Sequence, residues 1–208
     1  MGSKDGMDGA LSLLDWRRMV FALYAAVRAE PDPQAAHELW RRTRAELLTT
    51  HPDSPVPEPE RAAYPGPAVA PYDPSFRFEV PLDRDVEPMH LDVATGTDGV
   101  VPFDRVGRLH LAGIGQLDAW WLGSYGGGLF VPIRDGLAGT ETYGGGRYVL
   151  DTVKGADLGS REGRLIVDLN FAYQPSCAYD PAWACPLAPP DNVVAAPVPA
   201  GELYRPSR

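Results

Sequence analysis

The N-terminal part of the chain has the apolar spacing of amphipathic helices. Within residues 11–29 apolar side chains recur at three- and four-residue steps and predict one buried face, formed by Leu13, Trp16, Val20, Leu23 and Val27. A second helix is expected from Asp32, as N-cap, and Pro33 to about residue 50, where HPDSPVP ends it. Its buried stripe would contain Ala36, Leu39, Trp40, Thr43, Leu47 and Leu48. The polar, glycine-containing residues 1–10 are expected to be disordered.

From residue 76 the apolar period changes to two, which is typical of half-buried strands. Gly, Pro and Asp separate these segments, as they do in antiparallel sandwiches and barrels. Strands do not alternate with helices, which argues against a parallel nucleotide-binding sheet. The segments are FRFEV, MHLDVAT, RLHLAGI, LDAWWLGS, GLFVPIR, RYVLDTV and RLIVDLNF. We therefore predict an α+β, mainly β fold: an antiparallel β-barrel or sandwich with two N-terminal helices.

Two proline-rich segments, residues 51–75 and 173–208, flank the predicted β core of residues 76–172. They hold most of the chain's 22 prolines, and proline cannot donate a ladder hydrogen bond within a central strand. Because the first segment also carries apolar and aromatic residues, we expect it to be a strap packed on the fold rather than a free linker. A length of 208 residues fits one domain, from residue 11 to residue 208.

The charge balance argues against nucleic acid as a partner. The formal net charge is -9 and the isoelectric point about 4.9, so the chain repels phosphate backbones. The basic cluster of Arg41, Arg42 and Arg44 is interpreted as the solvated face of a helix. No apolar run is long enough for a membrane span, and no leader is recognised at the N-terminus. These observations favour a cytoplasmic protein that is not bound to membranes.

The run TYGGGRY raises the question of a phosphate-binding loop. Dinucleotide- and nucleotide-binding loops need a helix after the glycines, but the segment that follows is strand-like. We therefore expect a hairpin in which GLFVPIR pairs with RYVLDTV, and in which the glycines allow positive φ or close approach of another backbone. The alternative is a ligand site at the bare backbone. Its binding residues would be Arg147, as an anion anchor, with Gly144, Gly145, Gly146, Asn170 and Tyr179.

Ionisable residues near this hairpin are candidates for acid–base chemistry. Asp135, Glu141 and Tyr143 lie close to Arg147 in sequence, and Asp168 and Asn170 share a face of the last strand. One structural alternative is an Arg–Asp ion pair, if Arg147 enters the face that carries Asp168 and Asn170. The other is that Asp168 and Asn170 hydrogen-bond the backbone of the C-terminal strap.

Cys177 and Cys185 lie in CAYDPAWAC, within the second strap. Three interpretations of the pair are open: a structural disulfide or thiol pair, a catalytic or redox role for Cys177, and a metal site. A metal site would need two further ligands, and none of the four histidines has finger-like spacing to the cysteines, so no metal is assigned.

Long motifs in the C-terminal half resemble a bacterial and archaeal family known as domain of unknown function 1684. The resemblance covers about residues 11–202. The first motif is an Asp followed by a TYGGGRY hairpin, here Asp135 and Thr142 to Tyr148. The others are D-x-N-x-A-Y-x-P-x-C-A-Y (Asp168 to Tyr179), C-P-x-x-P-P-x-N (Cys185 to Asn192) and A-G-E (Ala200 to Glu202). The resemblance implies no activity, cofactor or catalytic residue.

Three hypotheses for function remain open. The first is a pocket for a small polar or anionic ligand, in a protein that could also be an enzyme. The second is a structural or protein-interaction module, in which the polar cluster only anchors the C-terminal strap and Trp120, Trp121, Tyr125 and Trp183 form a contact surface. The third is a flavin- or metal-dependent barrel enzyme, although no residue identifies a cofactor.

Overall fold

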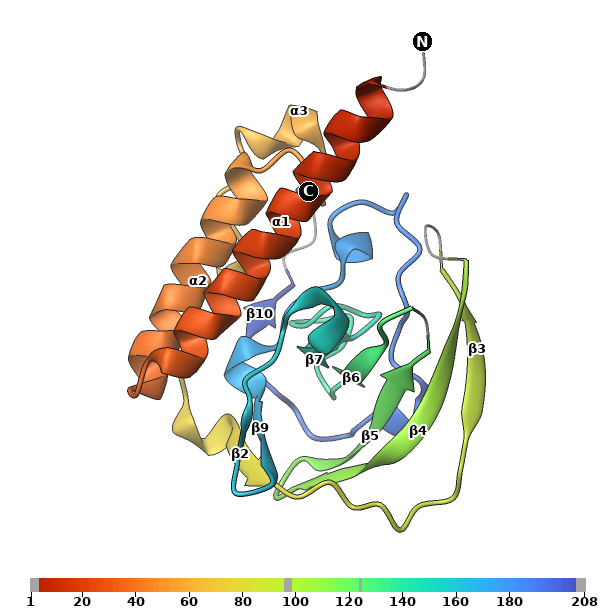
Figure 1. Ribbon diagram of the computed structural model, residues 1–208. Coiled ribbons are helices and arrows are strands. Elements are labelled where there is room, and N and C mark those ends of the chain that lie inside the picture. Colours follow the sequence, from red (N-terminus) through yellow and green to blue (C-terminus); the bar gives the residue numbers. More distant parts are fainter. Residues whose placement is uncertain (1–3, 96–98, 124, 205–208) are drawn as a thin grey trace.

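Two long helices lie side by side against a body of antiparallel sheets (Figure 1). The computed structural model describes residues 4–95, 99–123 and 125–204. Helix α1 spans Lys4–Ala29 and helix α2 spans Pro33–Thr50. No helix in this part of the chain is long and apolar enough to cross a bilayer.

The helix pair packs through the stripes that the sequence predicted, with differences at its N-terminal end. Trp40 from α2 is fully buried and forms a cluster with Leu23 and Val27 from α1 and with Phe171. Asp32 caps α2 by accepting a hydrogen bond from the Gln34 N–H at 3.0 Å, as predicted. Helix α1 begins at Lys4, so residues 4–10 of the segment expected to be disordered are helical, since each added residue extends an existing helix by one hydrogen bond. Residues 1–3 of that segment lie outside the described residues. Leu13 is exposed, contrary to the prediction, since the packed part of α1 is its C-terminal half.

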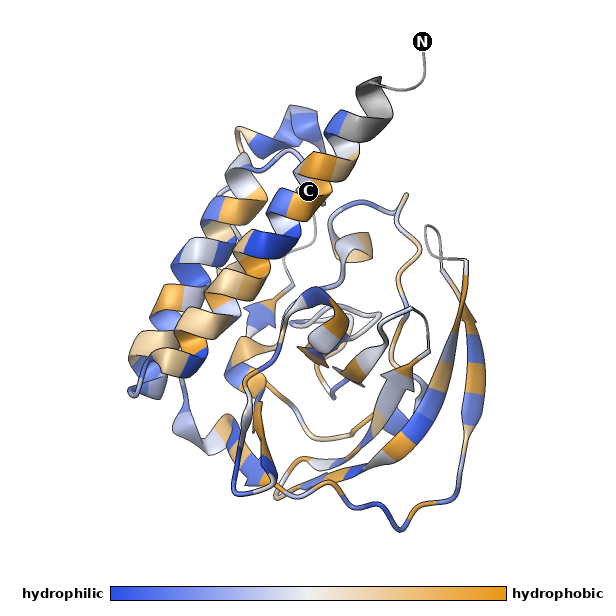
Figure 2. Ribbon diagram, in the orientation of Figure 1, coloured by the Kyte–Doolittle hydropathy of each residue, from blue (hydrophilic) through white to orange (hydrophobic). Residues whose placement is uncertain are grey.

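All strand pairs in the three sheets are antiparallel. The largest sheet has the order β3-β4-β5-β6-β7, a second has the order β2-β9-β8, and β1 pairs with β10. Orange and blue alternate along β3 and β4, as expected for strands with one buried face (Figure 2). The strands are β1 (Ala68–Val69), β2 (Arg77–Val80), β3 (His90–Ala94), β4 (Val100–Leu111), β5 (Gly115–Leu122), β6 (Gly128–Ile133), β7 (Arg147–Asp151), β8 (Ser160–Arg161), β9 (Arg164–Asp168) and β10 (Glu202–Leu203).

The two larger sheets share one apolar core. Fully buried residues of β4, β5, β6 and β9 meet there, among them Leu109, Leu117, Val131 and Val167. None of the sheets closes into a barrel within the described ranges. The structure thus confirms the α+β, mainly β class, the two helices and the antiparallel sheets.

The two proline-rich straps contain more structure than expected, and they meet each other. The first includes the short helix α3 (Glu58–Arg61) and strand β1. The second includes the single 3₁₀ turns η4 (Ser176–Ala178) and η5 (Pro190–Asn192), and strand β10. Because β1 pairs with β10, the first strap is joined directly to the end of the second.

Candidate functional site

The predicted cluster at Arg147 is an internal anchor for the C-terminal strap. Arg147 opens β7 and is fully buried, and its Nη2 donates to Asp135 Oδ2 at 2.8 Å and to the Val198 carbonyl at 2.9 Å. Its Nη1 donates to the carbonyls of Ala200 and Glu202. The ion pair of Arg147 therefore forms with Asp135 and not with Asp168, the partner that the sequence suggested. Both terminal nitrogens of the guanidinium are bound to the chain itself, with no exposed face for an anion.

Two of the three glycines, Gly145 and Gly146, allow the strap to approach the hairpin closely. The predicted pairing of β6 with β7 is confirmed, with Ile133 opposite Arg147. Gly146 has a φ of +90°, and a Cβ there would lie 2.7 Å from the Ile133 carbonyl oxygen and 3.3 Å from Ala188 of the strap. A Cβ on Gly145 would lie 3.1 Å from Leu187, while Gly144 has more room. At Gly145 and Gly146 the missing side chains are accounted for by contacts within the chain.

Asp168 and Asn170 hold the first strap, not the C-terminal one. The Asn170 side chain accepts from the Asp73 N–H at 2.9 Å and donates to the Asp73 carbonyl at 2.8 Å. Asp168 caps the following 3₁₀ turn η3 (Leu169–Phe171) and pairs with Arg77 at 3.3 Å. Burial raises the pKa of the Asp168 carboxyl, while its hydrogen bonds to Asn170 and the charge of Arg77 act in the opposite direction. Asp168 thus belongs to a different substructure from Arg147.

Tyr179 belongs to a buried network that the sequence did not predict. Its hydroxyl donates to Glu202 Oε2 at 3.0 Å, and Arg44 forms an ion pair with the same carboxylate. Arg44 also lies over the Tyr173 ring, 4.6 Å from its centroid. The interpretation of Arg44 as part of a solvated basic face is therefore wrong, because this side chain points into the interface between α2 and the strap. Glu141 is exposed, and its backbone carbonyl accepts from the Tyr204 N–H at 2.8 Å.

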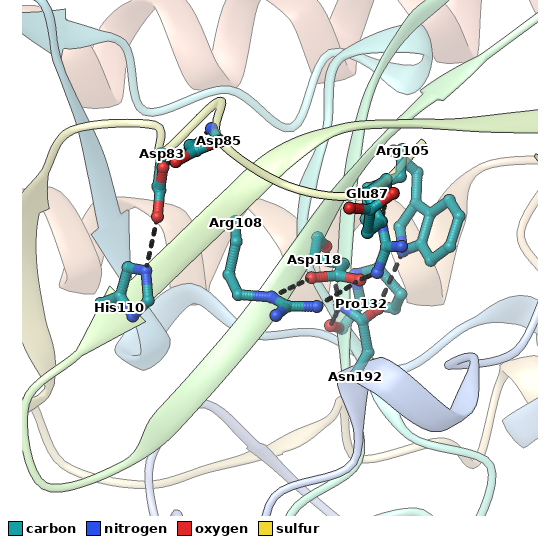
Figure 3. A network of polar contacts seen from close by, with 10 residues as sticks. Asp83, Asp85, Glu87, Arg105, Arg108, His110, Asp118, Pro132 and Asn192 are labelled. Carbon is teal, nitrogen blue, oxygen red and sulfur yellow. Dashed lines mark hydrogen bonds and ion pairs between the residues drawn. The ribbon is translucent and has the colours of Figure 1, made fainter. Parts of the chain in front are cut away.

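A further polar network fixes η5 against the large sheet (Figure 3). Asp118 of β5 is fully buried and paired with Arg105 at 2.7 Å and Arg108 at 2.6 Å. Asn192 donates to the carbonyls of Asp118 and Pro132, both at 2.9 Å. Its Oδ1 accepts from the Trp120 indole N–H at 2.8 Å. Trp120 is therefore buried and cannot contribute to a contact surface, whereas Trp121, Tyr125 and Trp183 are exposed.

Cys177 and Cys185 are brought together as free thiols in the second strap. The Cys177 N–H donates to Cys185 Sγ at 3.3 Å, and the Tyr143 hydroxyl lies 3.6 Å from Cys177 Sγ. Tyr143, which was grouped with Arg147 from the sequence, thus contacts the thiol pair instead. Both thiols are half-buried.

The feature that most resembles a ligand site is a cleft of about 380 Å³ between α2 and the first strap. It is lined on one side by α2 and on the other by β1 and the residues after it: Gln34, His37, Glu38, Arg41, Val69, Ala70, Pro71 and Tyr72. His37 is buried, yet its Nε2 has no hydrogen-bond partner. An unsatisfied buried acceptor is unusual, since most buried polar atoms in proteins are hydrogen-bonded.

The orientation of His37 follows from its surroundings. Its ring lies 5.4 Å from Phe171, 5.7 Å from Trp40 and 5.7 Å from Tyr72, between ring centroids. The ring also hydrogen-bonds the backbone of Asn170. Since Nε2 has no partner, Nδ1 makes this bond by donating to the carbonyl, which leaves a lone pair on Nε2. Burial lowers the pKa of His37 and so favours the neutral ring.

The cleft brings together residues that are far apart in the sequence. The backbone of Asn170, one of the candidate residues from the sequence, hydrogen-bonds the His37 ring. The Tyr72 hydroxyl donates to Asp168 Oδ2 at 3.4 Å. Burial, followed by the charge of Asp168, raises the pKa of Tyr72 to about 12. His37 itself was not predicted. The available signal was a histidine next to Ala36 and three positions before Trp40, on the buried stripe of its helix.

A second cleft, of about 370 Å³, lies beside η5 and is lined by Arg108, Ile114, Gly115, Gln116, Asp191, Val193, Val194 and Ala195. Its cation, Arg108, already binds the Asp118 carboxylate through Nε at 2.6 Å and Nη2 at 3.2 Å. The His37 cleft is therefore the stronger candidate, because there a buried polar atom lacks a partner.

Comparison with known proteins adds a family and a fold. Residues 62–203 match the model of a family described as "Protein of unknown function (DUF1684)". The solution NMR structure of an uncharacterised protein from Haloarcula marismortui is similar, with 30% sequence identity and a TM-score of 0.55. The match covers 78% of this chain and 89% of that one. Among curated proteins, none matches the sequence.

Proposed function

This chain belongs to the DUF1684 family, and we propose that it binds a small polar molecule in the cleft between α2 and the first strap. Two observations carry the proposal: Nε2 of His37 is buried without a hydrogen-bond partner, and His37 is one of the residues that line the cleft. A buried acceptor without a partner costs about 1–3 kcal/mol. A ligand with an O–H or N–H group would supply the missing hydrogen bond and remove that cost.

The lining residues indicate a neutral, compact ligand. Arg41 forms hydrogen bonds to both carboxylate oxygens of Glu38, at 2.9 and 2.7 Å, so the charges on the helical side compensate each other. Val69 and Pro71 offer apolar contact on the opposite wall. The volume of about 380 Å³ is within the usual range for small-molecule sites. Of the expected polar or anionic ligands, the cleft thus favours the polar ones.

The same geometry is compatible with proton abstraction. A neutral imidazole with Nδ1 bound to a carbonyl presents Nε2 as a base to any hydroxyl held against it. The eight lining residues include no cysteine, serine or threonine that could act as a nucleophile. Binding is therefore the function that we propose for the cleft.

The test is saturation-transfer NMR with three small neutral donors: pyrazole, acetamide and ethylene glycol. We expect at least one to bind the wild-type protein and to lose binding in His37→Phe, which keeps the aromatic packing but has no acceptor. His51→Phe is the matched control. His51 lies at the C-terminal end of the same helix and is also buried, but its Nδ1 accepts from the Asp53 N–H at 3.0 Å. Equal binding to wild type and His37→Phe, or no binding of any probe, would refute the proposal.

A further inference from the structure

The thiol pair in the second strap is chemically asymmetric. The two side chains are hydrogen-bonded to each other, and Cys185 Sγ also accepts from the Cys177 backbone N–H at 3.3 Å. The Ser176 backbone provides a further hydrogen bond to Cys185, and the charge of Lys154 acts on it as well. All these groups favour a negative charge on Cys185 Sγ over one on Cys177 Sγ.

The acidities follow this geometry. The hydrogen bond from the Cys177 thiol is the main cause that lowers the pKa of Cys185 to about 6, and the same bond raises the pKa of Cys177. Tyr143 and Tyr148 also face the pair, and burial raises the pKa of both phenols, so they remain neutral hydrogen-bonding groups.

The pair is accessible from solvent. Both cysteines are only half-buried, and residues 181–184 between them are exposed, including Trp183. A small molecule can therefore reach the loop without unfolding of the core.

We propose that Cys177 and Cys185 form a reversible dithiol–disulfide couple that exchanges with small-molecule disulfides, with Cys185 as the attacking sulfur. The Cys185 thiolate attacks one sulfur of the disulfide, forms a mixed disulfide and expels the other sulfur as a thiolate, which takes up a proton. Cys177 then loses its proton, attacks Cys185 Sγ and expels the second thiolate. In total, the protein dithiol is oxidised by two electrons and the small disulfide is reduced to two thiols.

The test uses the full chain in mixtures of reduced and oxidised glutathione, followed by acid quenching and mass spectrometry. We expect the folded wild-type protein to become lighter by two hydrogens in oxidised glutathione and to recover in reduced glutathione. Cys177→Ser should accumulate a single glutathione adduct at Cys185, since the serine hydroxyl can still donate to Cys185 Sγ. Cys185→Ser should form its adduct at least about tenfold more slowly at pH 7.

Circular dichroism establishes that each variant is folded before the exchange is measured. The proposal is overturned if the folded wild type stays reduced in oxidised glutathione while the guanidine-unfolded chain forms the disulfide. It is also overturned if Cys185→Ser reacts as fast as Cys177→Ser. Neither result depends on the His37 cleft, so this test and the ligand test can fail independently.

Discussion

Arg147 and His37 are both buried, and each leaves one side-chain nitrogen without a hydrogen-bond partner: Nε in Arg147 and Nε2 in His37. The other two guanidinium nitrogens of Arg147 bind one carboxylate and three carbonyls of the chain. The unpaired Nε–H therefore belongs to a group that is otherwise hydrogen-bonded within the protein. Around His37 the unpaired nitrogen belongs to a residue that lines a cleft.

This comparison separates two uses of buried polar residues. The Arg147 network replaces the regular hydrogen bonds that an irregular strap lacks, and it is therefore structural. The His37 ring is fixed by aromatic neighbours and one carbonyl, while its remaining acceptor contributes nothing to the fold. Residues of the first kind should matter for stability, and residues of the second kind for binding.

The largest expected effect is at Arg147. Arg147→Met removes the cationic partner of the buried Asp135 carboxylate and the Arg147 donor from three strap carbonyls, so the free energy of unfolding should fall by about 3–5 kcal/mol. Urea denaturation measures it. Arg42→Met is the control, because this exposed side chain makes a long ion pair with Glu38 at 3.9 Å and should change stability by less than about 0.5 kcal/mol. Similar small losses in both variants would show that Arg147 does not anchor the strap.

The second effect concerns the other attachment of the same strap. Asn192→Ala removes the acceptor of the Trp120 indole N–H and the donor to two backbone carbonyls, and it should cost about 2–3 kcal/mol. The exposed neighbour Asp191 gives the control, since Asp191→Ala should stay within about 0.5 kcal/mol of wild type in the same denaturation series. A loss at Asn192 no greater than at Asp191 would contradict the role of η5 as a second anchor.

The smallest effect on stability is expected at His37. His37→Phe loses one hydrogen bond to the Asn170 carbonyl but also removes the unpaired acceptor, so the unfolding free energy should remain within about 1 kcal/mol of wild type. A loss as large as that of Arg147→Met would place His37 among the structural anchors and remove the contrast between the two sites.

The pH dependence sharpens the same comparison. Burial lowers the pKa of His37 in the folded state below its ordinary value of 6.5, so between these two pKa values the unfolded chain binds more protons. The contribution of His37 to stability is therefore present above pH 6.5 and is lost as the pH falls through the folded pKa. The unfolding free energy of the wild type minus that of His37→Phe should therefore decrease as the pH falls below 6.5. The nearby charges of Glu38 and Arg41 act on the pKa in opposite directions. A difference that is flat from pH 7 to pH 5 would contradict a buried, neutral histidine.

The sequence predicted the elements better than their ends. Every one of the seven strand-like segments overlaps a strand, but β4 begins at Val100, well before the predicted RLHLAGI segment. The reason is a bulge between Arg105 and Gly107 that interrupts the alternation of apolar and polar positions. A Cβ at Gly107 would lie 2.5 Å from the Asp83 carbonyl oxygen, so this glycine reflects a close contact that the sequence does not reveal.

The candidate residues lie in buried polar networks, but their partners differ from those that the sequence suggested. Arg147, Asp135, Asp168 and Asn170 all lie in polar networks, yet they attach two different straps. Local sequence indicates which residues are polar within buried segments. It does not indicate which distant backbone reaches them, and the cleft at His37 depends on such distant segments, namely the residues after β1 and the carbonyl of Asn170.

The most direct measurement is long-range ¹H–¹⁵N NMR of the histidine side chains, with His37 identified by its absence from the His37→Phe spectrum. The structure predicts a neutral His37 at pH 7 with the proton on Nδ1 and a bare Nε2. It also predicts that the Nε2 resonance shifts when a probe such as pyrazole binds. A proton on Nε2, or a doubly protonated ring at pH 7, would contradict the central claim that this cleft presents a free acceptor to a ligand.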